Sequence, residues 1–320
     1  MTPETDTIET ETGWELEMDD EVEMPRYQKP RKATKTKEEV VAQLTEPEDT
    51  TDVLPMTYKP ARFEMGWLAS SLGSFYKANH IIDVLSYVKG GKEASVYCCK
   101  AHPDLGIELL AAKVYRPRRL RNLRNDAMYR EGRPILTSDG RAVKKSDHRI
   151  LRAIGKKTDF GVQAAHTSWL MYEFTTLQAL HEAGANVPRP YLSSENAILM
   201  DYAGELNNPA PALSQITLPS DEAETLFAET LRNIRLLWEA DFIHGDLSAY
   251  NILYWKGKIT LIDFPQVTHR HNNPHAHFIL KRDIQRVCDY FETQGVDCDA
   301  DEIFREMWSE QGEVEGERVE

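Results

Sequence analysis

The 320-residue sequence contains few cysteines and no long apolar run. Its four cysteines show no C-x-x-C spacing, and reduced thiols in a cytoplasmic protein are the simplest expectation for them. No stretch approaches the roughly 20 apolar residues that a membrane helix needs. The first residues are acidic and rich in threonine, unlike a secretory signal. We therefore expect a cytoplasmic protein without a membrane segment.

Charge is distributed unevenly along the chain, whose formal net charge is -14. Residues 1–52 contain 16 acidic and 6 basic residues, and residues 309–320 contain five glutamates and one arginine. Between them, residues 113–157 contain 15 Lys and Arg against 4 Asp and Glu. The two ends are too polar to bury enough apolar surface to order themselves. We expect disordered acidic tails over 1–60 and 309–320, and a basic flexible insert over 116–165.

The remaining sequence, in a chain that is 41% hydrophobic, can form a sizeable core. Apolar strand patterns cover 82–88, 94–100, 109–115 and 197–202, and helical spacing covers 67–76 and 169–180. Two short strands are expected at 252–255 and 259–262, followed by helix over 274–308. This order predicts an α+β, bilobal, protein-kinase-like fold. Its N-lobe would be β-rich and cover 61–202, and its trimmed, mostly helical C-lobe would cover 203–308.

The loop H-G-D-L-S-A-Y-N at residues 244–251 carries the first chemical signal. Phosphoryl transfer needs a carboxylate beside the attacking hydroxyl and an oxygen ligand for magnesium a few residues later. Asp246 and Asn251 have the spacing of a kinase catalytic loop, with Gly245 in place of the usual arginine. Because D-x-x-x-x-N is frequent by chance in loops, this motif needs support from others.

That support begins twelve residues later, where Asp263 ends an apolar strand in the run L-I-D-F-P-Q. Kinases hold a magnesium-binding aspartate at this place, in the sequence D-F-G. An aspartate buried there without a cation would be costly, which favours the metal role over a structural one. Pro265 replaces the glycine, and this rigid residue argues against the in–out flip of ordinary kinases.

A glycine pair lies between the first two predicted strands, where a phosphate-covering loop belongs. Gly91 fits the second glycine of G-x-G-x-x-G, whereas Lys89 and Ala94 replace the first and third. By itself a glycine pair between strands usually marks a hairpin turn. Its position next to the following strand strengthens the prediction.

Lys113 lies inside that strand, which is otherwise apolar, and must find an anion. ATP phosphates together with Glu173 on the next helix would satisfy it, although Glu182 competes on helical spacing.

Four histidines gather within nine residues after the second aspartate motif, at His269, His271, His275 and His277. Zinc sites are built from such sets. No cysteine or second histidine pair completes a tetrahedral site nearby. A structural loop or the edge of a substrate site is therefore favoured over zinc.

These motifs together resemble those of the RIO family of atypical serine/threonine protein kinases. G-K-E-A-S-V-Y at 91–97 is similar to the family's phosphate loop, and 244–251 and 263–266 are similar to its catalytic and metal loops. P-H-A at 274–276 with K-R-D at 281–283 resembles the end of the RIO domain. The similarity covers roughly 80–295. Too little structure is predicted before the phosphate loop for the winged helix of the Rio-two branch, so the chain resembles the Rio-one branch or its bacterial relatives.

The resemblance implies ATP and Mg²⁺ as cofactors and assigns roles to residues. Asp246 would be the catalytic base, acting with Lys113 and Asp263, and Asn251 and Asp263 would hold the metal. ATP would be bound by Lys113, Glu173 and a further set of residues from the phosphate loop and the adenine-facing strand end: Gly90, Gly91, Lys92, Glu93, Ala94, Ser95, Val96, Met200, Asp201 and Tyr202. Family members are also credited with ATPase cycling through phosphorylation of the metal-loop aspartate, here Asp263.

The family pattern is not matched everywhere. Lys89-Gly90 stands where the family usually has Ser-Thr, which removes hydroxyls that contact phosphate. Phe264-Pro265 stands where archaeal and eukaryotic members have Val-Ser. The protein acceptor is not indicated by the sequence, and self-phosphorylation is one option. Because of these departures, the resemblance leaves open whether a role in ribosome maturation, known for eukaryotic members, extends to this chain.

Two other functions compete with a RIO-type kinase. Aminoglycoside and choline kinases share H-G-D-x-x-x-x-N followed by I-D-F, so a small-molecule phosphotransferase is the first alternative. A non-catalytic scaffold that binds RNA or a ribosome-associated surface through the basic segment 116–157 is the second. The complete set of five catalytic residue types argues against the scaffold.

Overall fold

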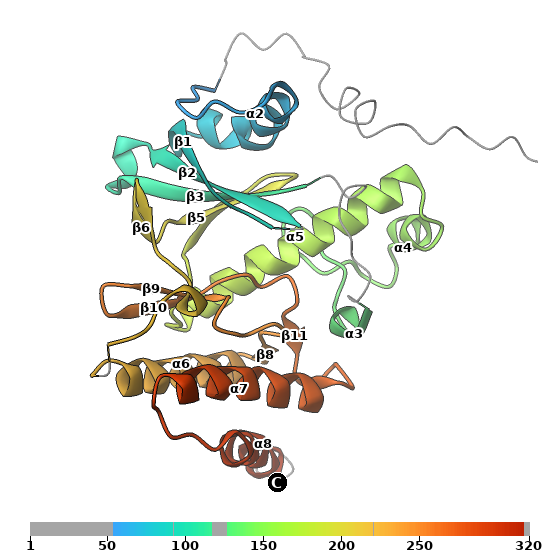
Figure 1. Cartoon of the computed structure of the whole chain (residues 1–320). Helices are drawn as coiled ribbons and strands as arrows, with labels where there is room; N and C mark the ends of the chain where they lie inside the picture. Colours follow the sequence, from blue (N-terminus) through green and yellow to red (C-terminus); the bar gives the residue numbers. More distant parts are fainter. Residues whose placement is uncertain (1–53, 92, 117–126, 220, 317–320) are drawn as a thin grey trace, which may run out of the picture.

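The computed structural model describes residues 54–91, 93–116, 127–219 and 221–316. Lys92, the segments 1–53 and 117–126, Ser220 and residues 317–320 lie outside the described part. Within the described part, the helices are too short or too polar to cross a bilayer. The chain forms two lobes, with a sheet and α2 in one and the helices α6, α7 and α8 in the other (Figure 1).

The first lobe is built on one antiparallel sheet whose strand order is β1-β2-β3-β5-β4. Its strands are β1 (Ile81–Gly90), β2 (Ala94–Ala101), β3 (Leu109–Tyr115), β4 (Pro190–Ser193) and β5 (Ala197–Asp201). The central strand β3 is buried from Leu110 to Tyr115, which explains its continuous apolar sequence. Its register places Lys113 between Val96 on β2 and Ile198 on β5.

Helix α2 (Arg62–Lys77) covers one face of the sheet, and α5 (Asp159–Glu182) passes along the other (Figure 1). Leu68, Leu72 and Phe75 of α2 belong to a buried cluster with residues of β1 and with alternate residues of β2 and β3. Leu170 and Leu177 of α5 belong to the larger cluster that continues into the second lobe. Because side chains point alternately to the two faces of a strand, one face of the sheet packs in the α2 cluster and the other face packs in the larger cluster.

The prediction of a disordered tail over 1–60 is wrong for residues 54–60. Leu54 is 4% exposed, and Met56 forms a parallel bridge with Val84 on β1. The Thr57 amide and hydroxyl donate to the Asp83 carboxylate at 2.8 and 2.6 Å. The free edge of β1 supplies backbone hydrogen-bond partners to residues 54–60. The sequence of this short segment did not indicate that pairing.

The segment 116–165 also contains more regular structure than predicted. Where described, it includes α3 (Ala127–Arg130), α4 (His148–Gly155) and the first turns of α5. The Thr158 hydroxyl caps α5 by accepting from the Gly161 amide at 3.1 Å. A Cβ on Gly161 would lie 1.9 Å from the Ala153 carbonyl oxygen, so only glycine permits this close approach of α4 to α5.

The second lobe contains α6 (Ala223–Glu239), α7 (Ala276–Thr293) and α8 (Ala300–Gly316). The remaining short strands pair as β6 (Gly204–Glu205) with β7 (Asn208–Pro209), β8 (Phe242–Ile243) with β11 (Thr268–His269), and β9 (Ile252–Trp255) with β10 (Lys258–Leu261). Among the described residues, 3-10 turns are formed by Pro103–Leu105, between β2 and β3, and by Leu213–Gln215. The bilobal α+β prediction with a trimmed helical C-lobe is confirmed.

Helix α8 corrects the second tail prediction, because it continues to Gly316 through residues expected to be disordered. The Asp299 carboxylate accepts from the Glu302 amide at 2.9 Å at the start of this helix. Asp301 and Glu302 in the first turn also complement the positive end of the helix dipole.

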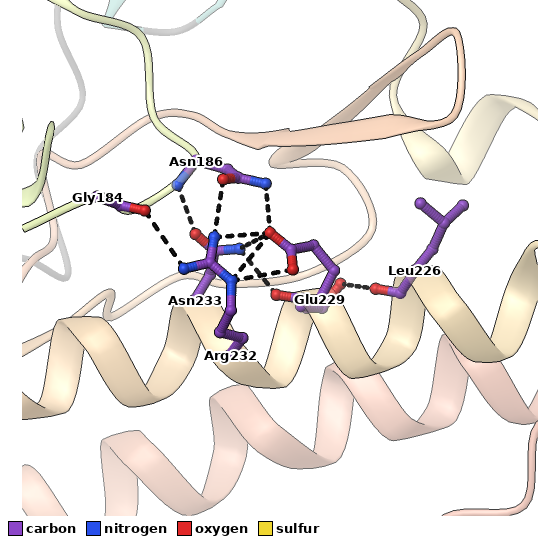
Figure 2. A network of polar contacts seen from close by, with 7 residues as sticks. Gly184, Asn186, Leu226, Glu229, Arg232 and Asn233 are labelled. Carbon is purple, nitrogen blue, oxygen red and sulfur yellow. Dashed lines mark hydrogen bonds and ion pairs between the residues drawn. The ribbon is translucent and has the colours of Figure 1, made fainter.

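A polar network joins the end of α5 to α6 (Figure 2). Asn186 donates from its amide to Asn233 Oδ1 at 2.5 Å and from its side chain to Glu229 Oε1 at 2.7 Å. Arg232 donates to Asn186 Oδ1 at 2.9 Å, and the Asn186 carbonyl accepts from the Leu261 amide of β10 at 2.8 Å. The loop between α5 and β4 is therefore held to both α6 and β10, the strand that precedes Asp263.

Candidate active site

A cavity of about 370 Å³ lies between the sheet and the loops of the second lobe. It contains most of the predicted site residues, which line it from both lobes: Gly91, Glu93, Ala94, Val96, Lys113, Glu173, Met200, Asp201, Tyr202, Asp246, Asn251 and Asp263. The fold therefore brings together residues that are up to 172 positions apart in the chain, counting from Gly91 to Asp263. Its other lining residues include Ala111, Leu253 and Ile262, which are apolar.

Lys113 occupies the centre of the polar end of this cavity. Its Nζ donates to Glu173 Oε1 at 2.5 Å and to Asp263 Oδ1 at 2.7 Å. Burial opposes the charge of Lys113, but the carboxylates of Asp263 and Glu173 outweigh it and raise the pKa of the amine. Burial likewise opposes ionisation of Asp263, yet Lys113 lowers the pKa of that carboxyl. Lys113 and Asp263 are thus both charged at neutral pH.

Glu173 has two partners that the sequence did not reveal. Its Oε2 accepts a short hydrogen bond from the Tyr115 hydroxyl, and its Oε1 lies 3.4 Å from the Phe264 amide nitrogen. The carboxylate is 2% exposed, so each of these donors helps to offset its desolvation. Tyr115 ends β3 two residues after Lys113. Because residues i and i+2 of a strand share one face, this spacing could have predicted that Tyr115 lies near Glu173.

The catalytic-type loop requires glycine where protein kinases have arginine. Gly245 has φ +84°, and a Cβ there would lie 2.2 Å from the Gln266 carbonyl oxygen of the metal loop. Its amide donates to Asp283 Oδ2 at 2.7 Å, and its carbonyl accepts from Arg282 Nη2. Burial raises the pKa of Asp283, although His244 and Arg282 act in the opposite direction. Asp283 and Arg282 of α7 thus hold the loop by its backbone.

His244, directly before that glycine, is buried and neutral in character. Its Nε2 lies 3.1 Å from the Ile262 carbonyl oxygen, and its Nδ1 lies 3.3 Å from the Asp246 amide nitrogen. One ring nitrogen therefore meets an acceptor and the other a donor, which suits a neutral imidazole. Burial lowers the pKa of His244, in agreement with this arrangement. The ring ties the catalytic-type loop to the strand that leads to Asp263.

Asn251 and Asp263 lie on paired backbone segments, since the Ile262 amide donates to the Asn251 carbonyl at 2.9 Å. The Asn251 side-chain amide donates to the Asp246 carbonyl at 2.9 Å, which leaves its Oδ1 as an acceptor. Asp263 has φ +71°, a left-handed conformation that is strained for aspartate, and its side chain is 45% exposed toward the cavity. One amide oxygen and one carboxylate oxygen fit a hard divalent cation.

The phosphate loop matches the prediction only in part. Gly91, Glu93, Ala94 and Val96 line the cavity, whereas Lys92 lies outside the described residues. Gly90 and Ser95 are not among the lining residues. A Cβ on Gly90 would lie 2.0 Å from the Tyr87 hydroxyl, so its small size makes room for that ring. Lys89, which the prediction omitted from the site, lines the cavity instead.

The strand end at Met200, Asp201 and Tyr202 lines the apolar part of the cavity. The Asp201 carboxylate accepts from the Tyr191 hydroxyl at 2.8 Å and from the Arg189 amide at 3.1 Å. Both oxygens of the Asp201 carboxylate thus accept hydrogen bonds within the protein. These bonds fix the end of the loop between α5 and β4.

The four clustered histidines divide among three places in the fold. His269 Nδ1 lies 3.0 Å from Asp241 Oδ2 and His271 Nε2 lies 3.7 Å from Asp241 Oδ1, whereas His275 Nε2 lies 3.6 Å from Glu131 Oε2. His277 packs against Phe304 and Trp308 of α8, with ring centroids 4.6 and 4.8 Å away. Within the described ranges, no group of three or more His, Cys, Asp or Glu side chains is arranged to hold a metal.

The two lobes, the cavity between them and the converging Lys, Glu, Asp and Asn side chains define a protein-kinase-like phosphotransferase. The family model described as "RIO domain" matches residues 134–303. The chain is 30% identical over 237 residues to the RIO-type serine/threonine-protein kinase Rio1 of Methanocaldococcus jannaschii, covering 73% of this chain and 72% of the relative. It is 29% identical over 226 residues to the protein of that name from Haloferax volcanii, covering 71% and 69%.

Among solved structures, the Rio2 kinase of Chaetomium thermophilum, in a complex described as ADP/Mg²⁺-phosphoaspartate, is 19% identical with a TM-score of 0.50. The match covers 78% of this chain and 70% of that one, and it supports the fold. The chain belongs to the RIO family of atypical serine/threonine protein kinases. It is a kinase of the RIO type, and the two alternative functions raised by the sequence are not favoured.

Proposed function

We propose that this RIO-type kinase uses ATP and Mg²⁺ to phosphorylate a serine or threonine hydroxyl of a protein, with Asp246 as its catalytic base. The observation that carries the proposal is the convergence of Lys113, Glu173, Asp246, Asn251 and Asp263 on one cavity. Four reduced cysteines, three of them buried, are compatible with a cytoplasmic location.

ATP would lie with its adenine at the apolar end of the cavity, near Met200 and Leu253, and with its phosphates near Lys113. The Lys113 ammonium, fixed by Glu173, would contact phosphate oxygens. Gly91 and its neighbours would cover the phosphates from the sheet side. Binding of this kind depends on fixed charges, which Lys113, Glu173 and Asp263 provide here.

Asn251 Oδ1 and the Asp263 carboxylate would hold the magnesium ion, which neutralises charge on the phosphate oxygens. The Asp263 carboxylate, which accepts a hydrogen bond from Lys113, would then contact both Lys113 and the metal. Asp246 would accept the proton of the acceptor hydroxyl. The hydroxyl oxygen would bond to the γ-phosphorus while the bond between the γ-phosphorus and the ADP oxygen breaks. The products are a phosphorylated side chain, ADP and a proton.

A second fate of the phosphoryl group is also proposed, with Asp263 as acceptor. The solved Rio2 complex contains a phosphoaspartate by its description, and Asp263 in this chain is half-exposed and held in a left-handed conformation. Its carboxylate oxygen would bond to the γ-phosphorus with release of ADP. Water would then cleave the acyl phosphate to inorganic phosphate, so the net reaction would be ATP hydrolysis.

Radiolabelled ATP, supplied to the pure protein with and without casein, separates these fates. Label on Ser or Thr is expected to resist acid, and label on Asp263 is expected to be released by hydroxylamine. Asp246→Asn should lose about 10²–10⁴ in the rate of hydroxyl phosphorylation while it keeps ATP binding. Asp263→Asn should lose the hydroxylamine-sensitive label. Unchanged hydroxyl phosphorylation by Asp246→Asn would refute the base assignment.

A further inference from the structure

Arg286 forms an ion pair with the proposed catalytic base. Its Nη1 lies 2.9 Å from Asp246 Oδ1, and the two side chains are 40% and 52% exposed. Asp246 lines the nucleotide cavity, whereas Arg286 is not among the lining residues. The guanidinium therefore approaches the carboxylate from outside the ATP cavity. An acceptor hydroxyl must reach the same carboxylate, because ATP fills the other side.

Helix α7 carries Arg286. Arg282 and Arg286 are four residues apart on α7 and contact consecutive residues of the catalytic loop, the Gly245 carbonyl and the Asp246 carboxylate. The opposite face of α7 is buried through Leu280, Ile284 and Phe291. Two arginines on one anchored face thus fix the backbone and the side chain of the loop separately.

We infer that Arg286 is a positioning residue for the catalytic base. It holds Asp246 Oδ1 in one orientation and leaves the other oxygen for the acceptor hydroxyl, an inference that rests on the proposed function. Catalysis of phosphoryl transfer rests largely on positioning of the reacting groups and on electrostatic stabilisation, so the orientation of the group that meets the attacking hydroxyl matters. Loss of the arginine would therefore slow the transfer by letting Asp246 rotate.

A role in folding does not account for this arginine. Ion pairs between exposed side chains add little to stability because water and salt screen them. Within the described part of the chain, Arg286 hydrogen-bonds Asp246 alone, whereas neighbouring Arg282 bonds the loop backbone, Tyr129 and Asp283. We therefore expect Arg286→Ala to have the same melting temperature as wild type and a lower rate of catalysis.

The test measures steady-state phosphorylation of casein by wild type, Arg286→Ala and Arg286→Lys. Arg235→Ala is the matched control, since Arg235 is also a half-exposed helical arginine in an ion pair, 3.8 Å from Glu306. Arg286→Ala should lower kcat by about 10- to 100-fold with an unchanged KM for ATP. Lysine should restore part of the rate, and free guanidinium ion should restore part of the rate of the alanine variant.

A double variant decides between orientation and other effects. If Arg286 acts through Asp246, then Arg286→Ala should have no further effect on kcat in the Asp246→Asn background. A wild-type kcat in Arg286→Ala, or an equal loss in both backgrounds, would overturn the positioning role. Wild type that phosphorylates no hydroxyl, in casein or in itself, would instead overturn the proposed function and the inference with it.

Discussion

Lys113 and Glu173 meet at 2.5 Å although 60 residues separate them in the chain. The same Glu173 oxygen lies 3.4 Å from the Phe264 amide, so one carboxylate joins β3, α5 and the metal loop. Lys113 reaches Asp263 as well, at 2.7 Å. The metal loop is therefore held against α5 by polar contacts. In this loop the rigid Pro265 follows Phe264, where ordinary kinases have glycine.

Removal of Lys113 should destabilise the protein as well as inactivate it. Lys113→Met leaves Glu173, which is 2% exposed, without its cation, and loss of one partner of a buried pair costs about 3 kcal/mol. Urea unfolding without nucleotide measures the loss. The double variant Lys113→Met/Glu173→Gln should recover part of it, because no uncompensated charge is then buried. Equal stability of the single variant and wild type would show that water reaches Glu173.

Magnesium dependence should disappear when Asp263 loses its charge. Of the two proposed metal ligands, Asn251 and Asp263, Asp263 is the one that carries a charge, and hard cations prefer carboxylate oxygen. Nucleotide binding, followed by calorimetry at several Mg²⁺ concentrations, should become weak and independent of magnesium. Asp241→Asn is the control, since Asp241 is a similarly exposed aspartate that contacts His269 and Arg270 away from the cavity. The metal role fails if Asp263→Asn retains the magnesium dependence of wild type.

The glycine of the catalytic loop should tolerate no side chain. Gly245→Ala places a Cβ at φ +84° and 2.2 Å from the Gln266 carbonyl oxygen. Gly257 is a matched control, because it has φ +76° and nothing within 4 Å of its Cβ position. Both alanine variants bear the cost of the left-handed backbone, but overpacking should make Gly245→Ala about 2 kcal/mol worse. Thermal or urea unfolding gives the difference, and equal losses would mean that the metal loop moves aside.

Much of the site could be predicted because its residue types are tied to short motifs. Lys113, Glu173, Asp246, Asn251 and Asp263 all lie where the motifs and strand patterns placed them, although their roles stay proposals. Position within a motif was less informative for the phosphate loop. Lys89 lines the cavity while Gly90 lies under the Tyr87 ring, a packing detail that depends on the bulged pairing of β1 with β2.

Long-range partners were beyond the reach of sequence patterns. Arg286 and Asp283 lie on a helix about 40 residues after the loop they contact, and no local period connects them. Residues 54–60 were missed for a related reason. Their order comes from the edge of β1 and the Asp83 carboxylate, so it depends on tertiary contacts that a short segment without a strand or helix period does not indicate.

The last prediction concerns the basic segment 116–157, which we propose as a contact for a polyanion such as structured RNA. Residues 117–126 lie outside the described part, but α4 and the loop before it present exposed bases: Lys144, Lys145, Arg149, Arg152 and Lys156. The acidic segment 1–52 is the alternative source of counter-charge, and its competition with RNA is one outcome of the test.

Fluorescence anisotropy with a labelled RNA hairpin, at several salt concentrations, tests this contact. Lys145→Glu/Arg152→Glu should weaken binding and lower the salt slope by about 2, since each lost phosphate contact removes about 0.9 from it. Lys77→Glu/Lys100→Glu, two exposed lysines on α2 and β2, control for net charge. Deletion of residues 1–52 should strengthen binding and steepen the salt dependence if that segment competes. Equal weak binding by all four proteins would leave the segment as a solvated surface with no nucleic-acid partner.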